Sequence, residues 1–185
     1  LMTTRNFGPI LKFEKDTPNT IESVSNLVKM YKQGDTVILT FDQNPDKTQI
    51  ISFDITTKEV VKQTFDKPLR NVKSSRKKTN SFLYEDKIAI AAADSKVFSM
   101  YILDYPSGKF RKEYAVAKTE EIQFKNSPMV QLGGAYAHYR DLKKTSRFLR
   151  KITAKNFGIS VIKNKNNLQC TIGGYVERMS GGMPM

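Results

Sequence analysis

The chain has 185 residues, a formal net charge of +13 and 39% hydrophobic residues. Its 11 Phe and 8 Tyr can build a core, which excludes a wholly disordered chain. Its one cysteine, Cys170, excludes an intramolecular disulfide and a cysteine-based zinc site. No apolar run approaches the roughly 20 residues of a membrane helix, so we expect no transmembrane segment.

The positive charge is concentrated in two segments. Residues 67–80 contain 6 Lys and Arg and no acidic residue, and residues 136–168 contain 9 basic residues against 1 acidic. The rest of the chain is close to neutral. A binding surface for a negatively charged partner, if there is one, is therefore expected in these two segments.

The first predicted element, in chain order, is residues 21–31, whose apolar spacing fits a helix. Its polar and β-branched residues fit a strand equally well, and both interpretations stay open. Short apolar runs between turn residues then predict antiparallel strands. These strands are 37–41, 50–55, 60–65, 87–92, 97–103, 110–116, and a later hairpin of 159–163 and 169–173.

The strand and turn pattern repeats along the chain. Residues 35–66 and 86–117 align on Asp54 and Asp104, which are 50 positions apart. A repeat of about this length, built from short antiparallel strands, is the spacing of a propeller blade. The later hairpin falls out of this period, and we attribute the delay to an inserted helix at about residues 137–152.

On these two units, about a third of the chain, the sequence resembles the β-propeller-like repeat proteins of bacterial cell envelopes. The resemblance implies a mainly β fold, an antiparallel meander that is propeller-like or part of a propeller. It implies a single β-rich domain over residues 1–185, or a fragment of a larger propeller-like protein. It also implies a cell-envelope or secreted location, which the residues themselves leave unknown.

The inserted helix is predicted to be amphipathic and basic. Read at about 100° per residue, Leu142, Phe148, Leu149 and Ile152 fall on one arc. Asp141 falls in the predicted first turn, where the helix dipole favours an acid. The opposite arc is basic and consists of Arg140, Lys143, Lys144, Arg147, Arg150 and Lys151. That arc is either ordinary solvated surface or a contact surface for a polyanion, an acidic protein or an anionic lipid.

The segment 67–80 is predicted to be a solvated connection between the two units, or an arm that neutralises phosphates. The candidate contacts in it are Lys73, Arg76, Lys77 and Lys78. Both basic segments together form the candidate polyanion or partner-binding site.

No catalytic or metal site is predicted. Asp42, Asn44 and Asp46 alternate as in a calcium loop, but Lys47 stands where Gly is needed, so we interpret the three as turn formers. His138 is the only histidine and Cys170 the only cysteine, too few for a triad or a metal cluster. We therefore expect no enzyme activity and no cofactor.

The sequence thus favours a non-catalytic interaction or scaffold module. Its partner would be another protein or the remainder of a longer parent chain. The alternative is binding of a polyanion, either nucleic acid or an anionic surface, through the two basic segments.

Overall fold

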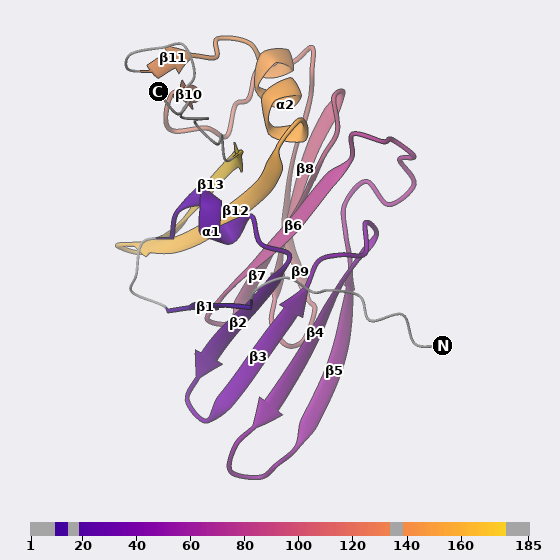
Figure 1. The fold of residues 1–185 in the computed structure, drawn as a ribbon, viewed down its shortest axis with the longest axis vertical. Helices are drawn as coiled ribbons and strands as arrows, with labels where there is room; N and C mark the ends of the chain where they lie inside the picture. Colours follow the sequence, from indigo (N-terminus) through magenta and orange to yellow (C-terminus); the bar gives the residue numbers. More distant parts are fainter. Residues whose placement is uncertain (1–9, 15–18, 134–138, 177–185) are drawn as a thin grey trace, which may run out of the picture.

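The computed structural model describes residues 10–14, 19–133 and 139–176, and it is mainly β with antiparallel sheets, as predicted (Figure 1). The first sheet has the order β1-β2-β3-β4-β5, with bounds Leu11–Phe13, Val28–Gln33, Thr36–Phe41, Lys47–Asp54 and Val60–Asp66. The second has the order β6-β7-β8-β9, with bounds Lys78–Tyr84, Lys87–Ala93, Val97–Asp104 and Phe110–Ala117. The described residues contain no closed barrel or propeller.

The remaining elements lie mainly after β9. They are β10 (Val130–Leu132), β11 (Tyr139–Asp141), α2 (Thr145–Thr153), and the hairpin β12 (Asn156–Asn164) with β13 (Asn167–Tyr175). One further helix, α1 (Ile21–Val24), precedes β2. No helix in the described ranges is long and apolar enough to cross a membrane.

The four-stranded meanders β2–β5 and β6–β9 have the same local construction. Lys58 N–H donates to the carbonyl of Asp54 at 2.9 Å, and Gly108 N–H donates to that of Asp104 at 2.8 Å. Lys58 and Gly108 both have positive φ, 64° and 72°, which closes the same turn in each unit. Each unit begins one strand earlier than the sequence pattern predicts, at β2 and at β6.

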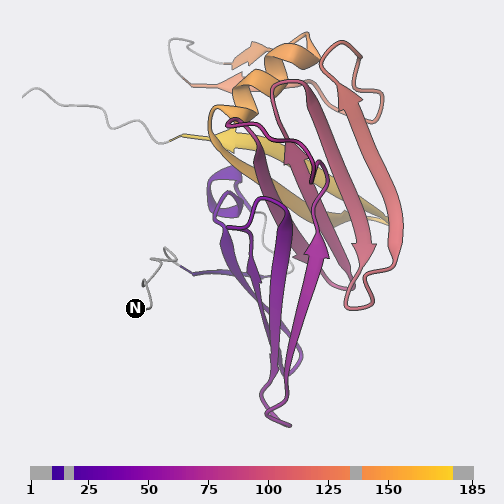
Figure 2. The same cartoon turned by 90° about the vertical axis from the view of Figure 1, so that its right-hand side faces the viewer.

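The two meanders pack against each other as layers. Figure 2 shows the β2–β5 sheet on the left and the β6–β9 sheet on the right. Gln63 Nε2 donates to the carbonyl of Pro106 at 2.7 Å. A Cβ added to Gly108 would lie 3.2 Å from the Phe65 ring, so the turn after β8 sits directly on β5. Buried side chains of both sheets and of the β12–β13 hairpin form one core cluster.

The inserted helix is shorter than predicted. The prediction of a helix over 137–152 is wrong for residues 139–144, because Tyr139–Asp141 pairs with β10 as strand β11. Asp141 is therefore not in a helical first turn. Leu142 N–H continues this strand pairing by donating to the carbonyl of Met129 at 2.7 Å. The segment is therefore a strand, although the spacing of its apolar residues fits a helix. Leu149 and Ile152 are buried against the rest of the chain, as their arc predicts.

Two other predicted segments, residues 21–31 and 67–80, are divided differently in the structure. Residues 21–31 are neither one helix nor one strand, because they divide into α1 and the start of β2. Thr20 caps α1, its side chain accepting from Ser23 N–H, and the helix ends after one turn. The predicted connection 67–80 ends early, because Lys78–Tyr84 pairs with β7 along its whole length.

Candidate functional site

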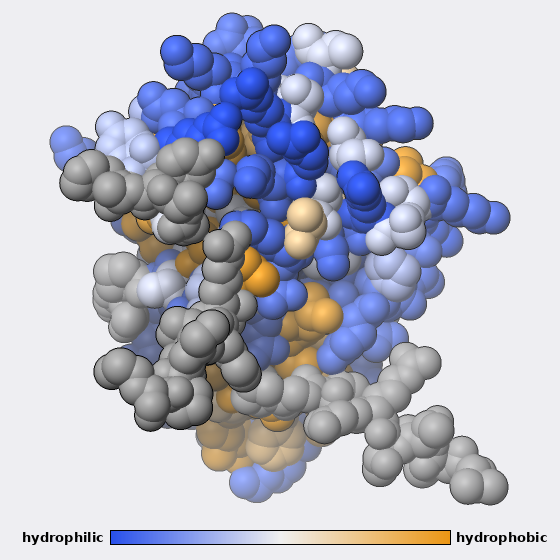
Figure 3. All heavy atoms as spheres, turned by 45° about the horizontal axis from the view of Figure 1, so that its top comes forward, coloured by the Kyte–Doolittle hydropathy of each residue, from blue (hydrophilic) through white to orange (hydrophobic). Residues whose placement is uncertain are grey.

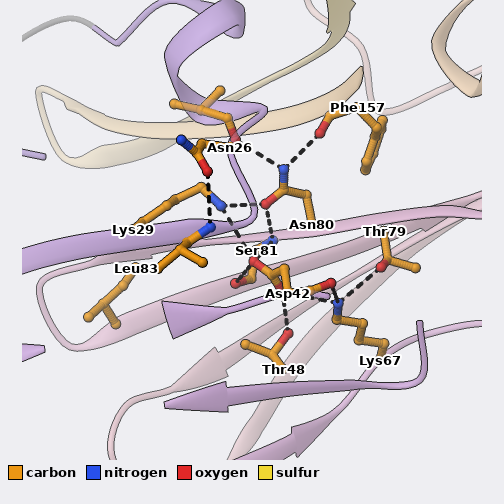
Figure 4. Close-up of polar contacts among 12 residues, drawn as sticks. Asn26, Lys29, Asp42, Thr48, Lys67, Thr79, Asn80, Ser81, Leu83 and Phe157 are labelled. Atoms are coloured by element: carbon orange, nitrogen blue, oxygen red, sulfur yellow. Dashed lines mark hydrogen bonds and ion pairs between the residues drawn. The ribbon is translucent and has the colours of Figure 1, made fainter. Parts of the chain in front are cut away.

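A buried carboxylate, Asp42, lies where four strands and their connections meet (Figure 4). Its Oδ1 accepts from Thr48 Oγ1 at 2.7 Å and lies 3.1 Å from Lys67 Nζ. Its Oδ2 accepts from the amide and the hydroxyl of Ser81, at 3.0 and 2.8 Å. Lys29 Nζ lies 3.4 Å from the same Oδ2. The side chains of Asp42, Lys29 and Lys67 are all fully buried.

The two lysines use their remaining donors on other elements. Lys67 Nζ donates to the carbonyls of Asp42 and Asn44 at 3.0 and 2.9 Å, and to Thr79 Oγ1 at 2.9 Å. Lys29 Nζ donates to Asn80 Oδ1. Asn80 Nδ2 donates onward to the carbonyls of Val24 at 3.0 Å and Phe157 at 2.7 Å. This buried network therefore joins both meanders, α1 and the β12–β13 hairpin.

The charges inside the network determine its protonation. Burial alone would raise the pKa of Asp42, but Lys67, Lys29 and the two hydroxyls outweigh it and hold the pKa at about 2. Burial lowers the pKa of Lys29 to about 8, against the attraction of Asp42. Burial also lowers the pKa of Lys67. No member of this group is open to solvent, so we assign the network a structural role rather than a chemical one.

Sequence reasoning missed this network. Asp42 was predicted to be a turn former, but only Asn44 acts so, accepting from the amides of Asp46 and Lys47 at 2.8 and 3.1 Å. Lys67 was counted only in the positive charge of the predicted solvated connection, residues 67–80. One feature of the sequence could have indicated the network. Lys29 and Asn80 are polar residues 51 positions apart, and they occupy matching places in the two meanders.

The structure divides the first basic segment. Lys73 and Arg76 are exposed. Lys77 is 5% exposed and lies 2.7 Å from Asp46 Oδ1, and Lys78 is a half-buried residue of β6. Only Lys73 and Arg76 of the four predicted contacts are thus fully presented to a partner.

The second basic segment is more open. Lys143, Lys144, Arg147 and Arg150 are exposed, and Lys151 is half-exposed. None of these five cations forms an ion pair with a residue that the structure describes. Arg140 lies apart from them, half-exposed on β11. We call Lys143, Lys144, Arg147, Arg150 and Lys151 the α2 basic surface, and Figure 3 shows hydrophilic residues gathered over this end of the molecule.

Several cations elsewhere have a carboxylate within 4 Å, although other exposed lysines, among them Lys62, Lys109 and Lys163, have no such pair with a described residue. The pairs are Lys12 with Glu14, Arg70 with Asp66, Lys77 with Asp46, Lys87 and Arg111 with Asp104, and Lys125 with Glu121. The α2 basic surface differs from those isolated lysines in its density, because five cations without an ion pair to a described residue lie within residues 143–151.

Two hollows lie outside the buried network. One, about 630 Å³, opens beside the start of α2; Lys118, Lys143 and Lys144 line it together with Glu120, Glu121 and Asp141. The other, about 500 Å³, is lined by aromatic residues at one end of β2 and β6, among them Phe13, Tyr31, Phe82 and Tyr84. Tyr31 is buried there, and burial raises the pKa of its hydroxyl.

Of the two residues that could support catalysis, the structure describes only Cys170. His138 lies outside the described residues. Cys170 is half-buried on β13, and burial raises the pKa of its thiol to about 11, which makes it a poor nucleophile. The described ranges contain no group of three His, Cys, Asp or Glu side chains placed to hold a metal ion. The absence of enzyme activity remains a prediction.

Comparisons with known proteins add no identity. No protein-family model, no curated protein and no solved structure matches the chain. The resemblance to propeller-like envelope proteins thus stays an expectation from the repeat pattern.

Proposed function

We propose that this chain is a non-catalytic binding module that contacts an anionic partner through the α2 basic surface. The observation that carries the proposal is the set of five cations on residues 143–151 without a carboxylate partner in the described chain. Leu149 and Ile152 fix the helix to the core, so Arg147 and Arg150 are held in the solvent-facing direction. Regularly spaced phosphates or carboxylates suit such a surface.

Neighbouring elements support this assignment. Lys118 is exposed in the hollow beside the start of α2, and Lys125 lies there too, 3.7 Å from Glu121. Lys73 and Arg76 belong to the segment that joins β5 to β6, which Figure 1 places at the upper right, towards the α2 end. A long polyanion would be able to reach both basic segments, whereas a single small anion would not.

The test is binding by the purified chain at low salt. The probes are fluorescently labelled single-stranded and duplex oligonucleotides, read by anisotropy, and vesicles containing phosphatidylserine, read by co-sedimentation. We expect binding to at least one probe, and loss of that binding in Lys144→Glu/Arg147→Glu/Arg150→Glu. The proposal fails if no probe binds, or if the triple variant binds as the wild type does.

We also propose that the repeats follow a propeller-like arrangement in which β2, β6 and β12 are the innermost strands. The matched turns of the two meanders and the hydrogen bond from Asn80 to the Phe157 carbonyl support this. An experimental structure in which these three strands surround one axis is the expected result. A sandwich without such an axis would contradict it.

A further inference from the structure

The β10–β11 hairpin carries the most exposed apolar side chains in the described part of the chain. Leu132 is 73% exposed and Tyr139 is 62% exposed, and no other large apolar residue that the structure describes exceeds 54%. The two lie directly opposite each other, at the end of the hairpin where β10 leaves the ladder. Val130 is also exposed and lies two positions before Leu132, on the same face. We call Val130, Leu132 and Tyr139 the apolar hairpin patch.

The opposite face of the hairpin points towards the rest of the chain. Gln131 lies between Val130 and Leu132 on β10, and its Oε1 atom is buried. Because side chains alternate along a strand, the apolar hairpin patch points away from the protein. Exposed apolar side chains that gather in one place are typical of contact surfaces, whereas scattered ones are ordinary.

The apolar hairpin patch lies next to the α2 basic surface. Leu142 N–H donates to the carbonyl of Met129, so the base of the hairpin leads directly into Lys143 and Lys144. Lys143 follows Tyr139 by four positions, which keeps their Cα atoms within about 14 Å. Figures 1 and 2 both place β10, β11 and α2 at the same end of the molecule. One partner can therefore contact both surfaces at once.

An anionic bilayer combines the two chemistries that these surfaces require. Its head groups offer negative charge to lysine and arginine, its acyl chains accept leucine and valine, and tyrosine is enriched at the boundary between them. A nucleic acid matches the basic surface and can stack on Tyr139, but it has no apolar phase for Leu132 and Val130. The apolar centre of a protein interface is depleted of lysine, whereas Lys143 and Lys144 adjoin this patch.

We propose that the chain binds the surface of an anionic membrane, with the apolar hairpin patch inserted among the upper acyl chains and the α2 basic surface among the head groups. Interfacial segments bury their apolar side about 5–10 Å deep, which is within the span from Tyr139 to Lys143. Asp141, which pairs with Val130 at the base of the hairpin, stays with the head groups. This inference rests on the proposed function, to which it adds the class of partner and the side chains that insert.

Co-sedimentation of the purified chain with vesicles tests the partner and the patch. The vesicles are phosphatidylcholine alone, or phosphatidylcholine mixed with phosphatidylserine. We expect binding to the mixed vesicles only, weakened by about tenfold or more in Leu132→Ser/Tyr139→Ser, because two large side chains no longer leave water. The matched control Val60→Ser/Phe110→Ser changes exposed apolar residues of β5 and β9, and it should bind as the wild type does.

A fluorescent label reports insertion itself and does not depend on how the double variant folds. In a Cys170→Ser background, Leu132→Cys and Val60→Cys each provide one thiol for the environment-sensitive dye NBD. With mixed vesicles, we expect the emission of the label at position 132 to rise and shift to the blue, and that of the label at position 60 to stay unchanged. An unchanged label at position 132 on bound protein would overturn the insertion.

The results separate this inference from the proposed function. If Leu132→Ser/Tyr139→Ser binds mixed vesicles as the wild type does while Lys144→Glu/Arg147→Glu/Arg150→Glu does not, the basic surface binds head groups alone. Binding to oligonucleotides but not to vesicles would assign the surface to nucleic acid. Either result overturns the inference and leaves the proposed function standing, whereas binding to no probe overturns both.

Discussion

Two groups of cations in this molecule have opposite surroundings. Lys29 and Lys67 are fully buried and share one carboxylate, Asp42, with hydroxyls and carbonyls accepting their other protons. Lys144, Arg147 and Arg150 are exposed and have no ion pair with a described residue. The net charge of +13 therefore combines charges that hold the fold together with charges that are free to act on a partner.

The largest effect is expected when the carboxylate of the buried network is removed. Asp42→Ala leaves two buried ammonium groups without a counterion, and breaking a buried ion pair from one side costs about 3–5 kcal/mol. Urea denaturation followed by circular dichroism measures the free energy of unfolding. A loss below about 1 kcal/mol would show that the network does not hold the two meanders together.

The same network should make stability depend on acid. The pKa of Asp42 is about 2 in the folded chain, below the ordinary 3.8, so its ionised form stabilises the fold above pH 5. That contribution disappears as the pH falls from 5 towards 2. The stability advantage of the wild type over Asp42→Asn should shrink by on the order of 2 kcal/mol across this window, measured by urea denaturation at each pH. An advantage that is constant with pH would contradict the assignment.

An intermediate loss of stability is expected when the ion pair of Lys77 and Asp46 is broken. This pair is less buried than the Asp42 network but less exposed than the α2 basic surface. Lys77 is 5% exposed, but its partner Asp46 is 42% exposed. Asp46→Ala should therefore reduce the free energy of unfolding by clearly less than Asp42→Ala does, because solvent screens the exposed carboxylate of this pair. A loss as large as that of Asp42→Ala would remove the distinction between buried and surface cations.

The smallest effect on stability is expected at the α2 basic surface. Arg147→Gln/Arg150→Gln changes exposed residues without ion pairs, and such substitutions alter stability by no more than about 0.5 kcal/mol. Thermal unfolding of this variant beside the wild type checks the expectation. Clear destabilisation would mean that these arginines serve the fold rather than a partner.

The hairpins were predictable because their turns carry local signals. Asp54 and Asp104 begin matching turns: the Asp54 side chain accepts from the amides of Thr56 and Thr57, and Gly108 adopts its positive φ without steric cost. The flanking alternation then fixed β3–β5, β7–β9 and β12–β13, as the structure confirms. Local chemistry of this kind needs no knowledge of distant contacts.

The predictions from the sequence were wrong where contacts with residues far away in the chain determine the local structure. Tyr139–Asp141 fits a helix by periodicity but pairs with β10, and Lys78 opens a strand because β7 lies beside it. Asp42 reads as a turn residue because its partners, Lys29, Lys67 and Ser81, are 13 to 39 residues away. The α2 basic surface was partly predictable, since charge is visible in the sequence but ion pairing is not.

The salt dependence of binding tests most directly the claim that the α2 basic surface is a binding surface. Each phosphate contacted contributes about −0.7 to −0.9 to the slope of log affinity against log salt. We predict that Lys144→Glu/Arg147→Glu/Arg150→Glu abolishes binding to the oligonucleotide or vesicle that the wild type binds. The matched variant Lys62→Glu/Lys109→Glu/Lys163→Glu removes the same charge from exposed residues of other elements and should keep most of the slope. Equal losses in the two variants would show that net charge, and not this surface, governs the interaction.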